Sequence, residues 1–194
     1  MKRKRTKASQ PDTKRRKRIR NSIRLLLSPE QQLLEAVRNQ KLGHLEHLIA
    51  NGADVNTRDD LHYTPLALAA WSGRSDVLQV LLQAGATAAI NQRDREEGIT
   101  PVHAAVIVCR DWESASPDNV FHLLAAGADP NSPDRDGWTP LHSCAFYHLP
   151  QLIPALLAAG ADPTQRDNWE HTPADIAAER GFADITVLLS GRTG

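Results

Sequence analysis

Apolar residues recur along this chain in short helical patterns that polar turns interrupt at regular intervals. Leu66–Trp71 is rich in small apolar residues, and Asp76–Gln83 places leucine and valine on one face before the pattern stops at Gly85. Glycine just past the last apolar residue is a common helix end, because glycine adopts a left-handed backbone without strain. Such a segment is therefore predicted to be two short helices joined by a turn.

This two-helix pattern recurs along the chain. Thr-Pro stands at residues 64, 100, 139 and 172, at intervals of 36, 39 and 33 residues. Threonine caps helix N-termini and proline is favoured at the first helical position, so each pair predicts the start of a helix. Leu-Leu-x-x-Gly-Ala at 81–86, 123–128 and 156–161 marks the end of the second helix. One helix pair cannot bury its own apolar face, so the units are predicted to stack side by side.

Three departures from the pattern are expected to alter the structure locally. His62 and Glu170 stand where the turn of other units has glycine. The second full unit has 26 residues from its proline to its glycine where the first and third have 20, which predicts six extra residues within 109–119. Pro150 and Pro154 are expected to delay or bend the second helix of the third full unit.

Thr-Pro-Leu-His at 139–142, an Ala-rich first helix and Gly-Ala-Asp at 160–162, together with the basic period of 33 residues, resemble the ankyrin repeat family. The resemblance covers about residues 30–191, some five repeats, and implies an all-α solenoid of helix pairs with β-turn tips. It divides the chain into a tail, 1–28, and a repeat domain, 29–194. The expected repeats are an N-terminal cap at 29–58, then 59–93, 94–133 with the long inter-helix loop, 134–166, and a C-terminal cap at 167–194.

Charge divides the chain at nearly the same place. Residues 1–24 hold 12 Lys or Arg and one acid, a formal charge of +11, and the rest of the chain carries −11. The tail has two isoleucines and no aromatic residue. It is predicted to be disordered, because its like charges repel and it has little apolar surface to offset the entropy of ordering.

The basic residues of this tail form two clusters. Lys2 and Arg3 are separated by ten residues from a run of five, namely Lys14, Arg15, Arg16, Lys17 and Arg18. This spacing resembles a bipartite nuclear localisation signal, which implies binding to an importin and a location in the nucleus, the cytoplasm or both. Binding of DNA or RNA through residues 2–20 and organelle targeting remain as alternatives.

Several classes of protein are excluded by the rest of the composition. The apolar run Leu25–Leu27 is too short for a signal peptide or a membrane span. Two cysteines, Cys109 and Cys144, form neither a CxxC pair nor a disulfide framework, which suits a reducing compartment. We therefore expect a soluble intracellular protein with no membrane partner.

The residue types needed for catalysis or metal binding are present but are not grouped. His103 and His142 fall at the His of Thr-Pro-x-His, where the family resemblance implies a structural hydrogen bond between adjacent turns. His44 and His47 share a helix but lack an evident third ligand. Cys144 replaces an alanine of the packed pair and is expected to be buried. We expect no catalytic residue, no metal site and no cofactor.

The family resemblance implies a concave binding surface built from the turn tips and the first helices. Twenty positions of this chain correspond to the family's variable surface, and six of its nine aromatic residues fall among them. Aromatic residues are frequent anchors of protein interfaces. Tyr63 and Trp138 have a second interpretation, in which they cover the neighbouring repeat. Trp112, in the long loop, is expected either to cover the core or to contact a partner.

The sequence thus predicts a non-catalytic scaffold or adaptor that binds a basic or amphipathic segment of a partner protein. The candidate partner-binding residues are Asp60, Tyr63, Trp71, Glu96, Glu97, Trp112, Trp138, Phe146, Tyr147 and Trp169. Four of the acids near the turn tips, Asp60, Glu96, Glu97 and Asp136, suggest an acidic edge. Two other functions remain open: a nucleic-acid-binding arm with an adaptor array, and a substrate receptor of a ubiquitin ligase, for which no docking motif is legible.

Overall fold

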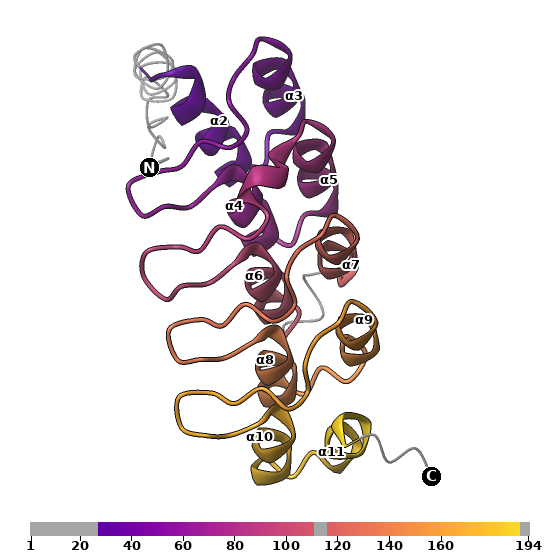
Figure 1. The fold of residues 1–194 in the computed structure, drawn as a ribbon. Coiled ribbons are helices and arrows are strands. Elements are labelled where there is room, and N and C mark those ends of the chain that lie inside the picture. Colours follow the sequence, from indigo (N-terminus) through magenta and orange to yellow (C-terminus); the bar gives the residue numbers. More distant parts are fainter. Residues whose placement is uncertain (1–26, 111–115, 191–194) are drawn as a thin grey trace, which may run out of the picture.

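A computed structural model describes residues 27–110 and 116–190, and the statements below concern those residues. They form ten α-helices, one short 3₁₀ helix and no strand (Figure 1). Two predictions fall on residues that the structure does not describe: disorder of the basic tail, 1–28, of which residues 1–26 are outside the described range, and the role of Trp112. In chain order the helices are α2 (Pro29–Arg38), α3 (Leu42–Ala50), α4 (Pro65–Trp71), α5 (Ser75–Gln83), η1 (Ala86–Ala89), α6 (Pro101–Val108), α7 (Asp118–Ala125), α8 (Pro140–Tyr147), α9 (Ile153–Ala158), α10 (Pro173–Glu179) and α11 (Ala183–Leu189).

The helices stand in two parallel columns (Figure 1). Helices α2, α4, α6, α8 and α10 form one column and α3, α5, α7, α9 and α11 the other. Long hairpin-like loops, residues 57–63, 92–99, 132–138 and 165–171, project to one side of the first column. This arrangement confirms the predicted all-α solenoid of stacked helix pairs.

Each first helix begins where the Thr-Pro pair predicts it. The Thr64 hydroxyl accepts the backbone N–H of Ala67 at 3.2 Å, and proline is the first helical residue of α4. Thr100 and Thr139 are caps of the same kind, and in their helices the third residue is histidine, whose ring nitrogen lies 2.8 Å from the threonine hydroxyl. The local sequence therefore fixes these helix starts.

One expected departure from the repeat is absent and two are present. His62 and Glu170 have φ of +65° and +67°, in the left-handed region that Gly98 and Gly137 occupy in the other two hairpins, so the expected alteration of these two turns was wrong. Carboxylates of Asp59 and Asp167 accept the turn N–H groups and hold this backbone without glycine. Helix α6 ends at Val108 and α7 begins at Asp118, so the extra residues lie between them. Helix α9 begins only at Ile153, with Pro154 in its first turn, which confirms its late start.

The core runs without interruption along the stack. Leu33, Leu66 and Leu141 are fully buried at equivalent places in α2, α4 and α8. Burying a leucine side chain stabilises a fold by about 2 kcal/mol. Cys109 and Cys144 are also fully buried, as expected for Cys144, and burial raises the pKa of the Cys109 thiol to about 11. Both thiols are therefore packing groups.

Candidate functional site

An aspartate holds the turn of each projecting hairpin. One carboxylate oxygen of Asp94, Oδ1, accepts the backbone N–H groups of Glu96, Glu97 and Gly98 at 3.0, 2.8 and 3.0 Å. Asp94 is only 8% exposed, and its own N–H donates to the carbonyl of Ile99 at 3.0 Å, which closes the loop. Three charge-assisted bonds to one oxygen fix the turn in a single shape.

The same role recurs in the other hairpins through Asp59, Asp134 and Asp167. The sequence analysis missed these four residues, although a signal exists. An aspartate precedes each Thr-Pro threonine by five or six residues. A carboxylate next to a turn is well suited to accept turn N–H groups.

Backbone hydrogen bonds join neighbouring hairpins into one continuous edge. The N–H of Arg95 donates to the carbonyl of Leu61 at 3.0 Å, and that of Arg135 to Glu97 at 2.8 Å. The N–H of Asn168 donates to Asp136 at 3.0 Å. The tips therefore hold fixed positions relative to one another, as a binding edge needs.

Buried histidines tie each of two first helices to the next hairpin. His103 Nε2 lies 3.0 Å from the carbonyl oxygen of Trp138, and His142 Nε2 lies 3.1 Å from that of His171. Because Nδ1 faces the capping threonine, the geometry suits a neutral ring that donates from Nε2. Burial lowers the pKa of His103 to about 4 and also lowers that of His142. The predicted structural role of both histidines is confirmed.

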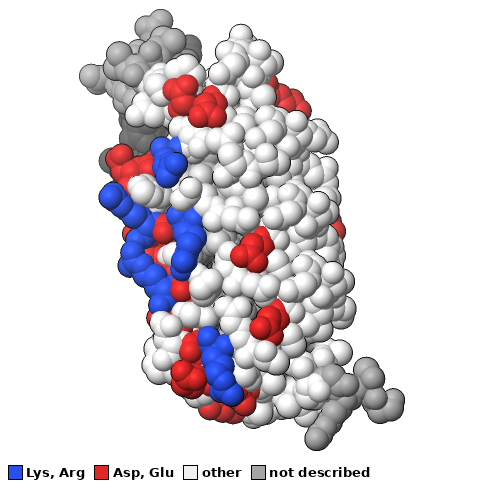
Figure 2. All heavy atoms as spheres, in the orientation of Figure 1, with Lys and Arg blue, Asp and Glu red and all other residues white. Residues whose placement is uncertain are grey.

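The hairpin edge carries both signs of charge (Figure 2). The four aspartates that hold the turns are buried or half-buried, and five other acids are exposed. Five exposed arginines accompany them, so acidic and basic side chains are equal in number at the surface of the edge, although the four turn aspartates give the hairpins a net negative formal charge. The acids are Asp60, Glu96, Glu97, Asp136 and Glu170, and the arginines are Arg58, Arg93, Arg95, Arg135 and Arg166.

Several of these arginines support the hairpin backbone. The Arg93 Nε–H donates to the carbonyl of Gly98 at 3.0 Å, and Arg135 donates to the carbonyl of Arg95 in the preceding hairpin. Arg166 donates to the carbonyl of Glu170. These arginines therefore stabilise the loops through hydrogen bonds, and they also place positive charge on the edge.

Three predicted partner-binding aromatic residues form one cluster beside the hairpins. The rings of Trp138 and Phe146 lie 5.1 Å apart, and those of Phe146 and Tyr147 meet edge to face at 5.1 Å. The Arg180 guanidinium lies 4.1 Å from the Phe146 ring, and that of Arg110 lies 5.8 Å from Tyr147. We call these three aromatic residues and the two arginines the aromatic cluster. It extends from the end of α6 across α8 to the end of α10.

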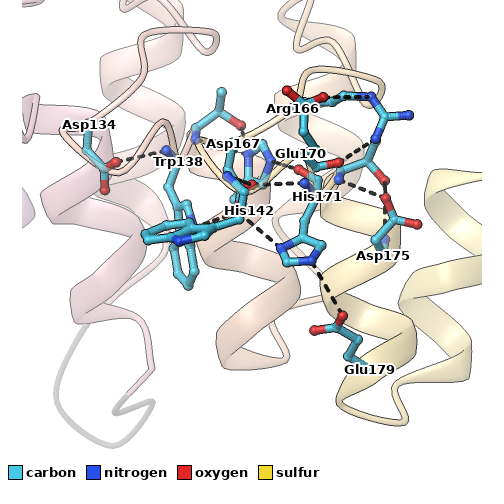
Figure 3. A network of polar contacts seen from close by, with 12 residues as sticks. Asp134, Trp138, His142, Arg166, Asp167, Glu170, His171, Asp175 and Glu179 are labelled. Carbon is cyan, nitrogen blue, oxygen red and sulfur yellow. Dashed lines mark hydrogen bonds and ion pairs between the residues drawn. The ribbon is translucent and has the colours of Figure 1, made fainter.

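Trp138 also takes part in holding the last hairpin. Its Nε1–H donates to Asp167 Oδ2 at 3.2 Å, and the same carboxylate lies 3.8 Å from the His171 ring (Figure 3). The other ring nitrogen of His171 lies 3.7 Å from Glu179. Trp138 therefore covers the neighbouring repeat, which was the alternative to partner binding in the sequence analysis. It also contributes to the aromatic cluster.

The remaining predicted partner-binding residues are dispersed along the array. Tyr63 donates from its hydroxyl to Glu96 at 3.5 Å and is half-buried, as is Trp71 at the end of α4. Trp169 is 57% exposed at the tip of the last hairpin. Two apolar residues at positions of the family's variable surface, Ile99 and Val106, are buried instead. They pack in the core, because that repeat presents apolar side chains on every face of α6.

The described residues offer no grouping suited to metal binding. The rings of His44 and His47 lie 6.3 Å apart, and no cluster of three or more His, Cys, Asp or Glu residues that could hold an ion occurs in 27–110 or 116–190. Among the helices placed by the structure, none is long and apolar enough to cross a membrane.

Comparison with known proteins gives a family match over most of the array. The family model for ankyrin repeats (3 copies) matches residues 33–112 and 108–193. Ankyrin repeat protein FPV031 of fowlpox virus (strain NVSL) is 33% identical over 164 residues, 81% of this chain and 46% of that protein.

Two mammalian proteins match shorter stretches. The RelA-associated inhibitor of Mus musculus is 43% identical over 84 residues, 42% of this chain and 9% of its own length. The NF-kappa-B inhibitor zeta of Homo sapiens is 36% identical over 94 residues, 46% of this chain and 12% of its own length. The chain thus spans less than half the length of each of these relatives.

Proposed function

The chain belongs to the ankyrin repeat family, and from that premise we propose that it binds a partner protein on the face formed by the hairpin edge and the aromatic cluster. Ankyrin repeats are in general a non-catalytic interaction fold, so the array is a protein-interaction module. The proposal divides the chain into a basic arm, 1–28, and the binding array, 29–194.

The aromatic cluster is the observation that carries the proposal. Phe146 and Tyr147 follow the small residues of α8 and lie beside Trp138 of the hairpin, so three large rings meet at one place. All three are half-buried, which leaves part of each ring for a partner. Half-buried aromatic residues backed by arginine are typical centres of protein interfaces.

The mixed charge of the exposed edge refines the chemistry of the partner. A partner with one sign of charge would meet as many like as opposite charges among the exposed side chains of the tips. We propose an amphipathic segment with apolar residues for the aromatic cluster and charges of both signs for the hairpins. Two relatives are named as inhibitors, one associated with RelA and one of NF-kappa-B, which supports a regulatory protein as the partner.

We also propose that the protein acts in the nucleus after import, and the basic arm supports this. Its two clusters, residues 2–3 and 14–18, have the spacing of a bipartite import signal for an importin. A charge of +11 over 24 residues also suits a second function, contact with DNA or RNA through residues 2–20. In that case the protein is a chromatin-associated adaptor whose arm contacts the nucleic acid.

Site-specific photo-crosslinking tests the binding face. A photoreactive residue is placed at Tyr147, at Trp169 or at Phe121, and partners are identified after irradiation in cell lysate. Phe121 is the matched control, because it is an aromatic residue with 41% exposure on α7, in the second column of helices. We expect the same partner to crosslink at Tyr147 and Trp169 and not at Phe121.

An arm deletion of residues 2–20 distinguishes the two functions. If the array is the binding module, crosslinks at Tyr147 persist in the deletion and only importins or nucleic acids are lost. If every partner is lost with the arm, nucleic-acid contact by the arm is the main function. Equal crosslinking at Tyr147 and Phe121 would contradict the proposal that the partner binds on the face formed by the hairpin edge and the aromatic cluster.

A further inference from the structure

A cavity of about 550 Å³ lies at the N-terminal end of the stack, apart from the aromatic cluster. It opens between α2 and the first hairpin, and its volume is within the range of ligand sites. The residues that line it are Leu27, Ser28, Glu30, Gln31, Leu34, Glu35, Arg38, Thr57, Arg58, Asp59 and Asp60.

The charges around this cavity are not balanced. Arg38 forms an ion pair with Asp59, so these two residues satisfy each other. Of the other charged residues in the lining, Glu30, Glu35 and Asp60 are acids and Arg58 alone is basic. The cavity therefore has a net negative charge.

One of these acids is held in its ionised form by its neighbour. The Ser28 hydroxyl hydrogen-bonds to Glu30 and holds the pKa of that carboxyl below its usual range. Ser28 also caps α2, because its Oγ accepts the N–H of Gln31 at 3.2 Å. Glu30 itself lies in the first turn of α2, where the helix dipole also favours a negative charge.

The chain supplies a cationic segment at the rim of the cavity. Leu27 lines the cavity and is also the first residue that the structure describes. The 12 Lys and Arg of residues 1–24 directly precede it, and residues 14–20 alone carry six of them. Eight residues separate Arg18 from Leu27, a tether that reaches about 30 Å when extended.

We propose that this acidic cavity is the docking site of the chain's own basic arm, residues 14–20. The short tether gives the arm an effective concentration in the millimolar range, roughly enough to fill a site of weak intrinsic affinity. Docked residues are withheld from an importin or a nucleic acid, so docking regulates the arm. This inference does not depend on the aromatic cluster as a binding face.

Paramagnetic relaxation tests the contact in the full chain. Thr13→Cys provides an attachment point for a nitroxide label next to residues 14–18. The native thiols of Cys109 and Cys144 are fully buried with raised pKa, so the label attaches selectively at position 13. We expect amide signals of 30–38 and 57–60 to lose about half their intensity or more, while those of 160–189 stay unchanged. About 0.5 M salt should restore the lost signals by screening.

A charge-reversal pair gives the matched control. Glu35→Lys with Asp60→Lys removes two acids of the cavity, and Glu97→Lys with Asp136→Lys makes the same charge change on the distal hairpins. The first variant is expected to reduce the broadening about fivefold and the second to leave it within about 20%, since screening limits the reach of distal charges. Circular dichroism verifies that both variants fold.

Three outcomes overturn the proposal. Broadening spread evenly over all repeats means that the arm is attracted by the whole acidic array and has no site. Equal effects of the two charge reversals lead to the same conclusion. Broadening that occurs only from a labelled copy to an unlabelled, isotope-enriched copy assigns the cavity to a second molecule.

Discussion

Buried histidine shows how a single residue links two repeats. The imidazole of His103 is fully buried between the Thr100 cap and the carbonyl of Trp138, which lies 35 residues further along the chain. A buried carbonyl without a donor costs about 1–3 kcal/mol, so the histidine stabilises both the helix start and the next hairpin. It does so only as a neutral ring, because burial penalises its charged form.

The first prediction concerns this neutral ring and pH. The pKa of His103 is about 4 in the folded chain and about 6.5 in the unfolded chain, so below pH 6.5 the unfolded chain binds the proton first. Stability from this group is complete above about pH 6.5 and falls by about 3 kcal/mol as pH drops to 4. Urea unfolding of wild type and His103→Gln between about pH 7.5 and 4.5 measures it.

Glutamine keeps a donor for the Trp138 carbonyl but does not titrate. We therefore expect a weaker loss of stability on acidification in His103→Gln than in wild type, with the residual slope from His142 and carboxylates. Parallel pH profiles for the two proteins would contradict the assignment.

At the scale of an element, the hairpin depends on one carboxylate. Asp167 is 6% exposed; its Oδ1 accepts the N–H groups of Trp169 and His171, each at 2.9 Å, and its Oδ2 accepts from Trp138 at 3.2 Å. This hairpin lacks the turn glycine, because Glu170 takes the left-handed position at φ +67°. The bonds to Asp167 offset the roughly 1–2 kcal/mol that such a backbone costs a non-glycine residue.

The second prediction removes this carboxylate. Asp167→Ala is expected to lower the free energy of unfolding by about 3 kcal/mol, because two turn N–H groups and one indole N–H lose their acceptor. Asp167→Asn keeps the Oδ1 acceptor and is expected to cost about 1–2 kcal/mol, the loss of the Trp138 bond. Urea unfolding measures the stability, and amide exchange of 167–171 reports the local effect.

The control for this pair is Asp136→Ala, an exposed aspartate at the tip of the preceding hairpin. It should change stability by less than about 0.5 kcal/mol, as for ordinary surface substitutions. If Asp136→Ala and Asp167→Ala cost the same, the bonds of the hairpin do not account for its stability.

At the scale of the whole molecule, stability comes from contacts between neighbouring repeats. Each first helix packs on the next in the order α2, α4, α6, α8 and α10 (Figure 1). A central helix is therefore covered on both sides, whereas α10 and α11 pack on a repeat on one side only among the residues that the structure describes. Val187 and Leu188 of α11 are accordingly exposed. In a stack of this kind an end repeat opens more easily than a central one.

The third prediction compares the same substitution at two positions. Leu141 in α8 is fully buried and Leu189 in α11 is 7% exposed, so both are core leucines. Leu141→Ala is expected to cost about 3–4 kcal/mol and Leu189→Ala about 1–2, because the end helix relaxes around the cavity. Denaturant unfolding measures both, and equal costs would contradict the expected relaxation of the end helix.

Sequence alone determined the features that local chemistry specifies. Thr-Pro pairs gave the helix starts and glycines the left-handed turns. Repeated spacing gave the stack, and the family resemblance implied the bond from His103 to the next hairpin. The helix starts and ends are specified within one repeat, so they can be recognised without knowledge of how repeats pack. The turns of His62 and Glu170 were expected to change and did not, because the aspartate at the start of each hairpin holds the left-handed backbone that glycine adopts elsewhere.

Tertiary structure decided which residues from different repeats meet. Trp138 and Phe146 belong to one repeat, and Arg180 of the next repeat joins them because α8 and α10 stack side by side. The equal number of exposed acids and arginines on the hairpin edge also emerged only there, since the burial or half-burial of the four turn aspartates changes which acids remain exposed. The cavity beside α2 likewise depends on how the first hairpin lies against that helix. Contacts of this kind depend on the rotation between stacked repeats, which a single period of sequence does not specify.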